Sequence, residues 1–340
     1  MRWLIASAVI LAVSAVCAGG YVYSQHRCLC AVGDNDDDVV VTVTRGQSFG
    51  TVRDTVADAG LLRCPDAWYW YARYKGLDRQ LKAGEFLLNR QLSGYDILDR
   101  LIEGKAVEYS VTLIEGWTAA QAIAAIQAHD AVETTLPADA AANDWLIAIG
   151  ADEDHLEGLL FPNTYRFERG TSDVEVVGRA YRLMRKELAD AWQQRADDLP
   201  LESPYEALTL ASIIEKETAR DDEREAIAGV FVRRLRKGMR LQTDPTVIYG
   251  LGNRYDGNIR RRDLVTDTPY NTYTRKGLTP TPIALSGRAS LRAAVTPADG
   301  DALFFVATGL PDGSHTFSAT EQEHNAAVAV YLQRLRARDQ

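Results

Sequence analysis

The chain carries an apolar run that ends in two carboxylates, Ala211-Ser212-Ile213-Ile214-Glu215-Lys216-Glu217-Thr218-Ala219. Apolar residues at positions 210, 211, 213 and 214 have the spacing of an α-helix, and Pro204 suits its first turn. At about 100° per residue, Glu217 falls on the face of these apolar residues, whereas Glu215 falls on the far side near Leu208. The pattern therefore predicts a helix whose last turn holds Glu217 among apolar groups.

A carboxyl among apolar groups is expected to keep its proton, because burial disfavours the charged form and raises the pKa. That property suits Glu217 to general acid and base catalysis. The alternative is a structural role in which Glu217 pairs with an arginine, such as Arg220 or Arg233. The residues of this stretch leave both interpretations open.

The composition is that of an ordinary globular protein. Of 340 residues, 46% are hydrophobic and 25% are charged, and the length allows one large domain or two to three smaller ones. The net charge of −9 argues against a nucleic-acid binder, which would carry an excess of basic residues. The histidines are scattered and no His-Glu-x-x-His occurs, so we expect no catalytic metal and no cofactor.

The N-terminus has the pattern of a membrane anchor. No charged residue occurs from Trp3 to Tyr23, and a helix of that length reaches about 31 Å, the thickness of a bilayer core. Arg2 precedes this run and an acidic segment, 34–38, follows it, which favours a cytoplasmic N-terminus. We therefore expect a single-pass anchor at 1–25 in the cell inner membrane, with the catalytic domain in the periplasm. A cleaved signal peptide or a lipoprotein site at Cys17 would also place the body outside the cytoplasm.

The cysteines all lie near the N-terminus, and their spacing does not settle their state. Cys28-Leu29-Cys30 lacks the Cys-x-x-Cys spacing of metal and redox sites. One cysteine of this pair could form a disulfide with Cys64, or the thiols could be free, and the sequence leaves both alternatives open.

After a polar linker, 26–38, the pattern predicts a small α+β module. The β-branched run 39–44 predicts a strand, helices follow at 49–59 and 65–74, and a strand returns at 82–88 before a helix capped by Ser93. This order and the turn at 45–48 resemble a LysM-type glycan-binding module. The aromatic residues of 65–74 would be either its core or a sugar-binding face. A strand and helix at 109–126 adjoin the module, and we group 39–130 as one domain.

Residues 131–340 are expected to form a larger mixed α+β domain. Helices are predicted from Asp173 as cap to Trp192, from 221 to 238, and from 321 to 338, with strands at 303–307 and 315–317. Two segments are polar and non-helical, 239–246 and 270–283. Long irregular segments in compact domains are often functional. The fold class is therefore α+β.

Several segments, taken in order, resemble the endolytic murein transglycosylase (YceG-like) family. They are Glu157-Gly158 with Phe161-Pro162-Asn163-Thr164-Tyr165, 211–217, 241–246 with Tyr249, Tyr270-Asn271-Thr272-Tyr273, Gly277-Leu278 and His315-Thr316-Phe317. The resemblance covers nearly the whole chain. The catalytic glutamate of the family matches Glu217, the residue that the helical periodicity also selects.

The resemblance implies cleavage of the β-1,4 bond from N-acetylmuramic acid to N-acetylglucosamine within peptidoglycan strands. Glu217 would protonate the leaving oxygen and then, as a carboxylate, accept the proton of the muramoyl C6 hydroxyl, which closes a 1,6-anhydro ring. Candidates for substrate binding are Gln242, Asp244, Asn271 and Tyr273, and Glu157 is a candidate supporting residue. Each could instead be structural. Expected partners are peptidoglycan strands and cell-wall synthases such as penicillin-binding proteins.

Two other functions remain open. A lysozyme-like muramidase would use Glu217 as acid and Asp244 as base. A non-catalytic peptidoglycan-binding scaffold for cell-wall synthases would need neither carboxylate.

Overall fold

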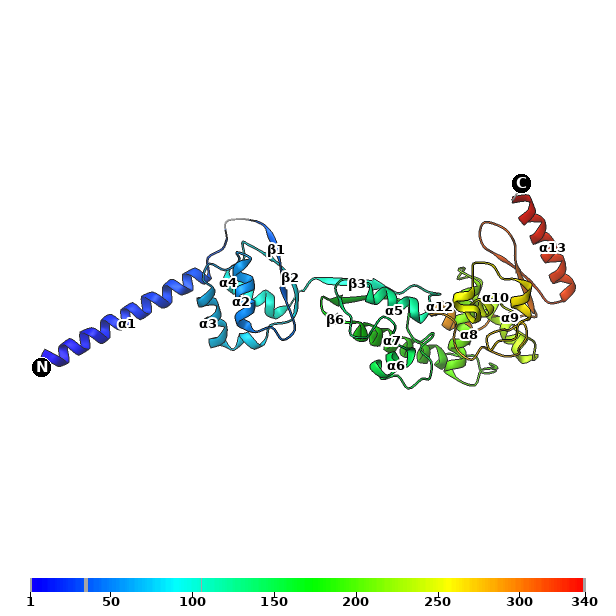
Figure 1. The fold of residues 1–340 in the computed structure, drawn as a ribbon, viewed down its shortest axis with the longest axis horizontal. Helices are drawn as coiled ribbons and strands as arrows, with labels where there is room; N and C mark the ends of the chain where they lie inside the picture. Colours follow the sequence, from blue (N-terminus) through cyan, green and yellow to red (C-terminus); the bar gives the residue numbers. More distant parts are fainter. Residues whose placement is uncertain (1, 34–35, 105, 339–340) are drawn as a thin grey trace. The chain divides into compact units, whose positions relative to one another are not determined.

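The computed structural model describes residues 2–33, 36–104 and 106–338, which form two compact units in a mixed α+β fold (Figure 1). The first unit reaches Tyr109 and includes Arg166–Thr171, and the second comprises Ser110–Tyr165 and the chain from Ser172 onward. Strands β3 (Glu108–Thr112) and β5 (Thr164–Glu168) pair with each other. The predicted fold class is therefore confirmed at the level of α+β.

The first unit has the predicted order of strand, two helices, strand and helix. Its elements are α1 (Arg2–Leu29), β1 (Asp38–Val43), α2 (Phe49–Asp58), α3 (Pro65–Lys75), a 3-10 turn (Leu77–Arg79), β2 (Gly84–Asn89) and α4 (Gly94–Glu103). β1 and β2 pair antiparallel, with Val41 opposite Phe86. Ser48 Oγ accepts from Thr51 N and so caps α2. Ser48 lies within Gly46-Gln47-Ser48-Phe49-Gly50, which has the Gly-x-Ser-x-Gly spacing of a nucleophile elbow. Because its hydroxyl caps α2, Ser48 has a structural role instead.

The aromatic residues of α3 divide between the core and the surface. Trp68 is fully buried and its Nε1 donates to the backbone oxygen of Gly94 at 2.8 Å. Trp70 and Tyr74 are 66% and 86% exposed. The core interpretation therefore holds for Trp68 alone among these three, because α3 packs one side against α1, α2 and α4 while Trp70 and Tyr74 face solvent.

A disulfide joins the end of α1 to the residue before α3. Cys28 and Cys64 are bonded with Cα atoms 6.2 Å apart, and Cys17 and Cys30 carry no disulfide.

Within the part of the chain that is described, none of the helices combines the length and the apolar character needed to cross a bilayer. The predicted span 3–23 includes side chains, at 4–6 and 8, that lie outside the described residues.

The second unit holds the helix that ends in Glu217. Its further elements, in chain order from β3, are α5 (Ala119–Gln127), β4 (Val132–Glu133), α6 (Ala142–Ile149), β6 (Thr171–Ser172), α7 (Asp173–Gln193), α8 (Pro204–Glu217), α9 (Arg224–Arg236), α10 (Asp244–Leu251), a 3-10 turn (Gly252–Arg254), α11 (Arg261–Val265), α12 (Arg288–Val295), β7 (Phe304–Ala307), β8 (His315–Ser318) and α13 (Glu321–Arg338). Residues 270–283 form no helix or strand, as predicted.

Two boundaries differ from the prediction. Ser172, not Asp173, caps α7, because Ser172 Oγ accepts from Glu175 N while the buried Asp173 carboxylate accepts from Gln127 and Thr135. α10 begins at Asp244, inside the segment predicted to be non-helical. Pro245 follows Asp244 there, and proline is well tolerated in a first turn because its missing N–H needs no partner.

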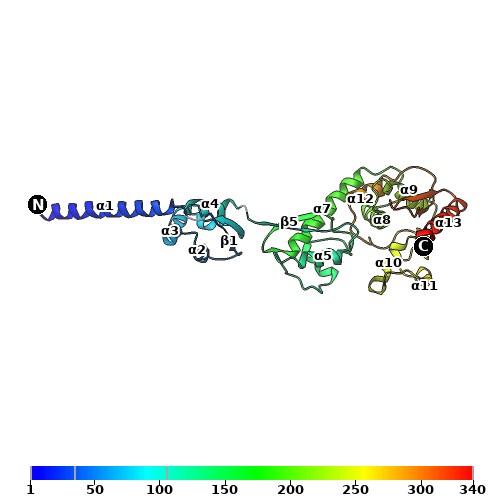
Figure 2. The same ribbon diagram turned by 90° about the horizontal axis from the view of Figure 1, so that it is seen from above.

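Helix α8 lies at the centre of the second unit. It packs against α7, α9, α10 and α12, and Figure 2 shows α8 grouped with α9 and α12. Residues 207–214 are all buried, so the helix is enclosed on every side and has no solvent-facing stripe. Even Ser212 is buried, where its Oγ accepts from Ile283 N at 2.9 Å and donates to Thr209 O at 2.7 Å. The sequence predicted that one face of α8 is buried, but neighbouring elements also cover the opposite face, which carries Leu208.

Candidate active site

Glu217 is the last residue of α8, and its carboxylate is partly buried. Its Oε1 accepts a hydrogen bond from Thr243 Oγ1. Burial raises the pKa of Glu217, and the negative charge of Asp244 raises it further. The bond from Thr243 and positive charge on His315 and Arg234 act in the opposite direction without reversing the shift. A glutamate in this setting holds its proton to higher pH than an exposed one.

The two arginines that could have neutralised Glu217 bind other groups. Arg220 donates to Asp222 at 2.6 Å and to the backbone oxygen of Asp312 at 3.0 Å. Arg233 donates to the backbone oxygens of Ala302 and Ala298. The structural alternative for Glu217, an ion pair with one of these arginines, is therefore wrong.

Thr243 is fixed by a second segment distant in sequence. Its backbone N–H donates to Thr272 Oγ1 at 3.0 Å, and Gln242 N donates to Thr272 O at 3.2 Å. Thr246 Oγ1 lies 2.9 Å from Thr272 Oγ1 and donates to Thr243 O at 2.8 Å. Gln242 has a φ of 53°, a left-handed conformation that a residue other than glycine seldom adopts. The segments 241–246 and 270–273, singled out from the sequence, thus meet beside Glu217.

The four candidate binding residues have different surroundings. Tyr273 donates its hydroxyl hydrogen to Asp244 Oδ1 at 2.6 Å, and burial raises the pKa of Tyr273 so that it remains a donor. Gln242 and Asp244 are exposed and accessible to a ligand. Asn271 is 1% exposed, and its Nδ2 donates to three backbone oxygens between residues 263 and 266. The structural alternative therefore describes Asn271, which shapes the loop that carries Thr272.

Glu157 links α5 to α10. One carboxylate oxygen accepts from the backbone N–H groups of Ala119 and Gly158, at 2.9 and 3.2 Å, and the other accepts from Tyr249 at 3.2 Å. Burial raises the pKa of Glu157. It lines a cavity of about 570 Å³ to which residues of α5, α6 and α10 also contribute. Because Asp244 begins the helix that carries Tyr249, Glu157 supports the site through α10.

Glu215 has a different environment from Glu217, although only one residue separates them. Its Oε2 accepts from the backbone N–H of Gly287 at 3.0 Å, at the start of α12. Its Oε1 lies 3.4 Å from Arg224, and the two side chains are 5% and 6% exposed. Arg224 also bonds to Asp221 and to Ser290. Glu215 therefore ties α8 to α9 and α12.

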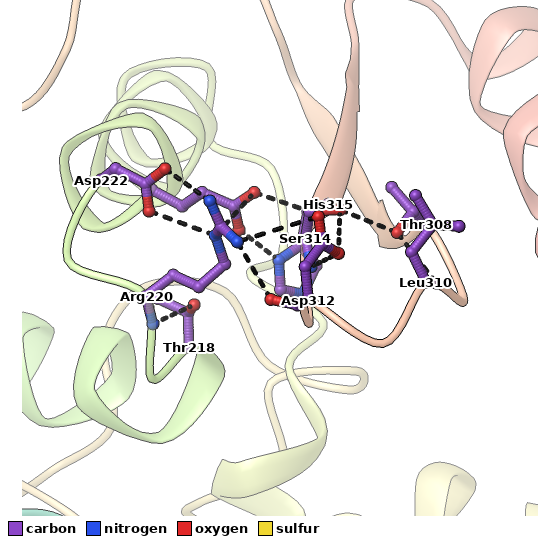
Figure 3. A network of polar contacts seen from close by, with 9 residues as sticks. Thr218, Arg220, Asp222, Thr308, Leu310, Asp312, Ser314 and His315 are labelled. Carbon is purple, nitrogen blue, oxygen red and sulfur yellow. Dashed lines mark hydrogen bonds and ion pairs between the residues drawn. The ribbon is translucent and has the colours of Figure 1, made fainter.

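Three polar residues around the end of α8 were not selected as site residues from the sequence. Thr243 lies within the segment 241–246, but its neighbours Gln242 and Asp244 were proposed as binding residues instead. Glu223 lies in a run of charged residues, and no pattern distinguishes it from the others. His315 lies in a segment that was singled out, yet no role was assigned to it. Figure 3 shows His315 in a network of polar contacts that also contains Arg220 and Asp312.

The chain is similar to several known proteins over most of its length. The model of the YceG-like family matches residues 41–330. The endolytic murein transglycosylase of Bacillus subtilis is 30% identical over 337 residues, which is 93% of this chain and 91% of that protein. The enzyme of that name from Streptococcus pneumoniae is 28% identical, and the chain spans only 62% of its length. A crystal structure of a YceG-like protein from Listeria monocytogenes has 31% identity and a TM-score of 0.52, covering 86% of this chain and 99% of that one. The chain therefore belongs to the YceG-like family.

Proposed function

We propose that this protein is a peptidoglycan lytic transglycosylase that cuts glycan strands internally and leaves 1,6-anhydro-N-acetylmuramic acid ends. The relatives named endolytic murein transglycosylase support the reaction class. The observation that carries the proposal is the state of Glu217, whose carboxyl is desolvated, raised in pKa and held by Thr243 without an arginine partner among the described residues.

One carboxyl can perform both proton transfers of this reaction. Protonated Glu217 gives its proton to the glycosidic oxygen as the bond from muramoyl C1 to that oxygen breaks. The resulting Glu217 carboxylate takes the proton of the C6 hydroxyl while that oxygen bonds to C1. The ring closes, the glutamic acid is restored, and no water is consumed.

The surrounding residues suit this cycle. Thr243 orients the Glu217 carboxyl, and its own position is fixed by Thr272. Asp244, held by Tyr273, adds negative charge near Glu217 and helps it keep the proton needed for the first step. Gln242 and Asp244 are exposed beside this carboxyl, where they are available to bind hydroxyl or acetamido groups of the saccharide.

The products test the proposal directly. Isolated sacculi digested in water enriched in oxygen-18 should yield muropeptides with anhydro ends and without the heavy isotope, as read by mass spectrometry. A muramidase that used Asp244 as its base would form reducing ends labelled with oxygen-18. The nearness of Asp244 to Glu217 makes this the second candidate, and labelled reducing ends as the main product would replace our proposal with it.

Substitutions of Asp244 and of Thr243 should shift the pH profile of kcat/KM in opposite directions. The alkaline limb of kcat/KM reports deprotonation of the general acid in the free enzyme. Asp244→Asn removes a charge that raises the pKa of Glu217, so the limb should move to lower pH, by roughly half a unit or more. Thr243→Val removes a hydrogen bond that lowers this pKa, so the limb should move to higher pH. Shifts of both variants in one direction would contradict the assignment of Glu217 as the acid.

We further propose that α1 anchors the chain in the inner membrane, with the catalytic unit in the periplasm. The uncharged run 3–23 supports an anchor. The Cys28–Cys64 disulfide supports an oxidising compartment. There the LysM-like module would meet glycan strands, close to the synthases that make them. Fractionation tests this arrangement: release of the full-length chain by high salt or alkaline carbonate would argue against an anchor.

A further inference from the structure

The second unit contains a cavity of about 570 Å³ for which the two proton transfers at Glu217 have no use. Alanine methyl groups of α5 and of residues 138–142 form much of its wall. Four polar residues that also line it touch one another in sequence: Glu157, Tyr249, Tyr270 and Thr281. An apolar space with a small polar group on one side is the usual construction of a site for a small ligand group.

The polar group of this cavity offers acceptors to a ligand. Tyr249 donates its hydroxyl hydrogen to Glu157 Oε2 at 3.2 Å. Thr281 donates to the backbone oxygen of Pro282 at 2.7 Å, so the hydrogen of the 2.9 Å contact between Tyr270 and Thr281 comes from Tyr270. All three hydroxyl hydrogens are therefore engaged within the protein, while lone pairs remain on the phenolic oxygens and on Glu157 Oε2. A ligand that meets this group has to supply the donors.

The charge of Glu157 has no cation to balance it inside the cavity. Its partners are the backbone N–H groups of Ala119 and Gly158 and the hydroxyl of Tyr249, all of them neutral. Apart from the exposed His155, the described residues that line the cavity include no basic side chain. A carboxylate removed from water is usually paired with a positive group. A positively charged ligand would supply that pair.

The remaining walls suit an ammonium group on an aliphatic chain. The rings of Tyr249 and Tyr270 meet edge to face, with centroids 4.9 Å apart and planes at 62°. Aromatic faces attract a cation, and an ammonium group carries three donors for the three acceptors. The alanine methyl groups leave room for the methylene groups behind it.

Short segments link this cavity to the catalytic residues. Tyr270 lies two residues before Thr272, which is at most about 7 Å of chain, and Thr272 binds the segment beside Glu217. Tyr249 follows Asp244 by five residues on α10, a rise of about 7.5 Å. In peptidoglycan a peptide stem leaves the muramic acid and carries a diamino acid as its third residue. Three extended residues span about 10 Å, so a stem on the muramic acid at Glu217 can reach the cavity.

We propose that this cavity binds the free ammonium group of the diamino acid of a peptide stem, with Glu157 as its counterion, and that the enzyme thereby prefers strands that are not cross-linked through that amine. This inference rests on the proposed function, because it takes the glycan strand as the substrate. Cross-linking converts the amine to an amide, which carries no charge and a single N–H. A cross-linked stem would leave Glu157 without its cation.

A pair of substrates that differ only at this amine tests the preference. The probes are soluble uncross-linked glycan strands and the same strands after N-acetylation of the diamino acid. We expect acetylation to raise KM about tenfold with little change in kcat, because the ammonium contact is made before and during bond cleavage. Equal kcat/KM values for the two substrates would overturn the inference.

Glu157→Gln should abolish the preference, because the side chain keeps its shape but loses its charge. The advantage of the free amine should fall from about tenfold to less than about twofold. Glu153→Gln is the matched control, since Glu153 accepts from Tyr181 at 2.8 Å and is not among the described residues that line the cavity. It should retain the full advantage. A preference that persists in Glu157→Gln, or an equal loss in Glu153→Gln, would contradict the assignment.

Ala124→Leu tests the cavity without changing Glu157. Ala124 is an exposed residue of α5 that lines the cavity, so a larger side chain there fills space without burying a new group in the core. The advantage of the free amine should fall as it does in Glu157→Gln, and the melting temperature should stay at the wild-type value. An unchanged advantage in Ala124→Leu would show that the amine binds elsewhere.

Binding measured without turnover separates this inference from the reaction. The full-length Glu217→Gln variant is titrated by calorimetry with a disaccharide peptide that has a free diamino acid amine, and with its N-acetylated form. We expect the free amine to bind about tenfold more tightly, and equal affinities would overturn the inference. If this difference is found but no anhydro ends form, the proposed reaction fails and the ammonium site stands. If anhydro ends form equally well from both substrates, the reaction stands and the ammonium site fails.

Discussion

Glu217→Gln should lower the rate of glycan-strand cleavage by about 10³-fold or more, and the variant should remain folded. Glutamine has nearly the same shape and can still accept from Thr243, but it cannot donate or accept a proton in the reaction. Because one side chain performs both transfers, no other carboxyl covers the loss. The measurement is the release of soluble muropeptides from isolated sacculi, by liquid chromatography, beside the melting curve of the variant.

The stability of Glu217→Gln at neutral pH should equal or exceed that of the wild type. Burial raises the folded-state pKa of Glu217 above its value in the unfolded chain. The stability linked to this group is then present at low pH and is lost as the pH rises through the raised pKa. Glutamine does not ionise and avoids that loss. A folded Glu217→Gln that released as much soluble material as the wild type would favour the non-catalytic scaffold.

Glu215→Gln should show the opposite pattern, a large loss of stability. Glu215 and Arg224 form a buried pair, and Glu215 also receives the N–H of Gly287 at the start of α12. Removing one partner leaves a buried guanidinium with less compensation, which costs on the order of 3 kcal/mol. Urea unfolding of the purified chain should show this as a lower midpoint at an unchanged slope.

The activity of Glu215→Gln completes the comparison. At temperatures where the variant is folded, its kcat should stay within about tenfold of the wild type, since Glu215 does not act on the reacting atoms. A loss as deep as that expected for Glu217→Gln, in a folded variant, would mean that the catalytic role had been assigned to the wrong carboxylate. The two variants differ by one position on one helix, so each is the control for the other.

Local signals predicted several helix starts, among them that of the helix that carries Glu217. Proline at position 204 and serine at position 93 marked helix starts, because caps and first turns depend on residues within one turn. The polar segment 241–246 and the irregular segment 270–273 were also singled out, and the structure brings them together beside Glu217. Their meeting through Thr243 and Thr272 could not be predicted, since the hydrogen bonds join residues 29 apart in sequence.

Long-range contacts decided which candidates can act. Asn271 looked like a ligand-binding amide, and only the fold shows that its nitrogen is bonded to the backbone around α11. Glu215 was predicted on the side of α8 opposite the apolar face, near Leu208, and the structure shows that α9 and α12 cover that side. Periodicity assumes one buried face, and a helix at the centre of a unit violates that assumption.

The sequence by itself determined a helix that ends at Glu217, because helix length and capping depend on near neighbours in the chain. Tertiary structure alone decided that Glu215 would be neutralised by Arg224 while Glu217 would keep a raised pKa. The physical reason is that the pKa of a carboxyl depends on the burial, hydrogen bonds and charges around it. For Glu217 these come from Thr243, Asp244 and His315, between 26 and 98 positions further along the chain.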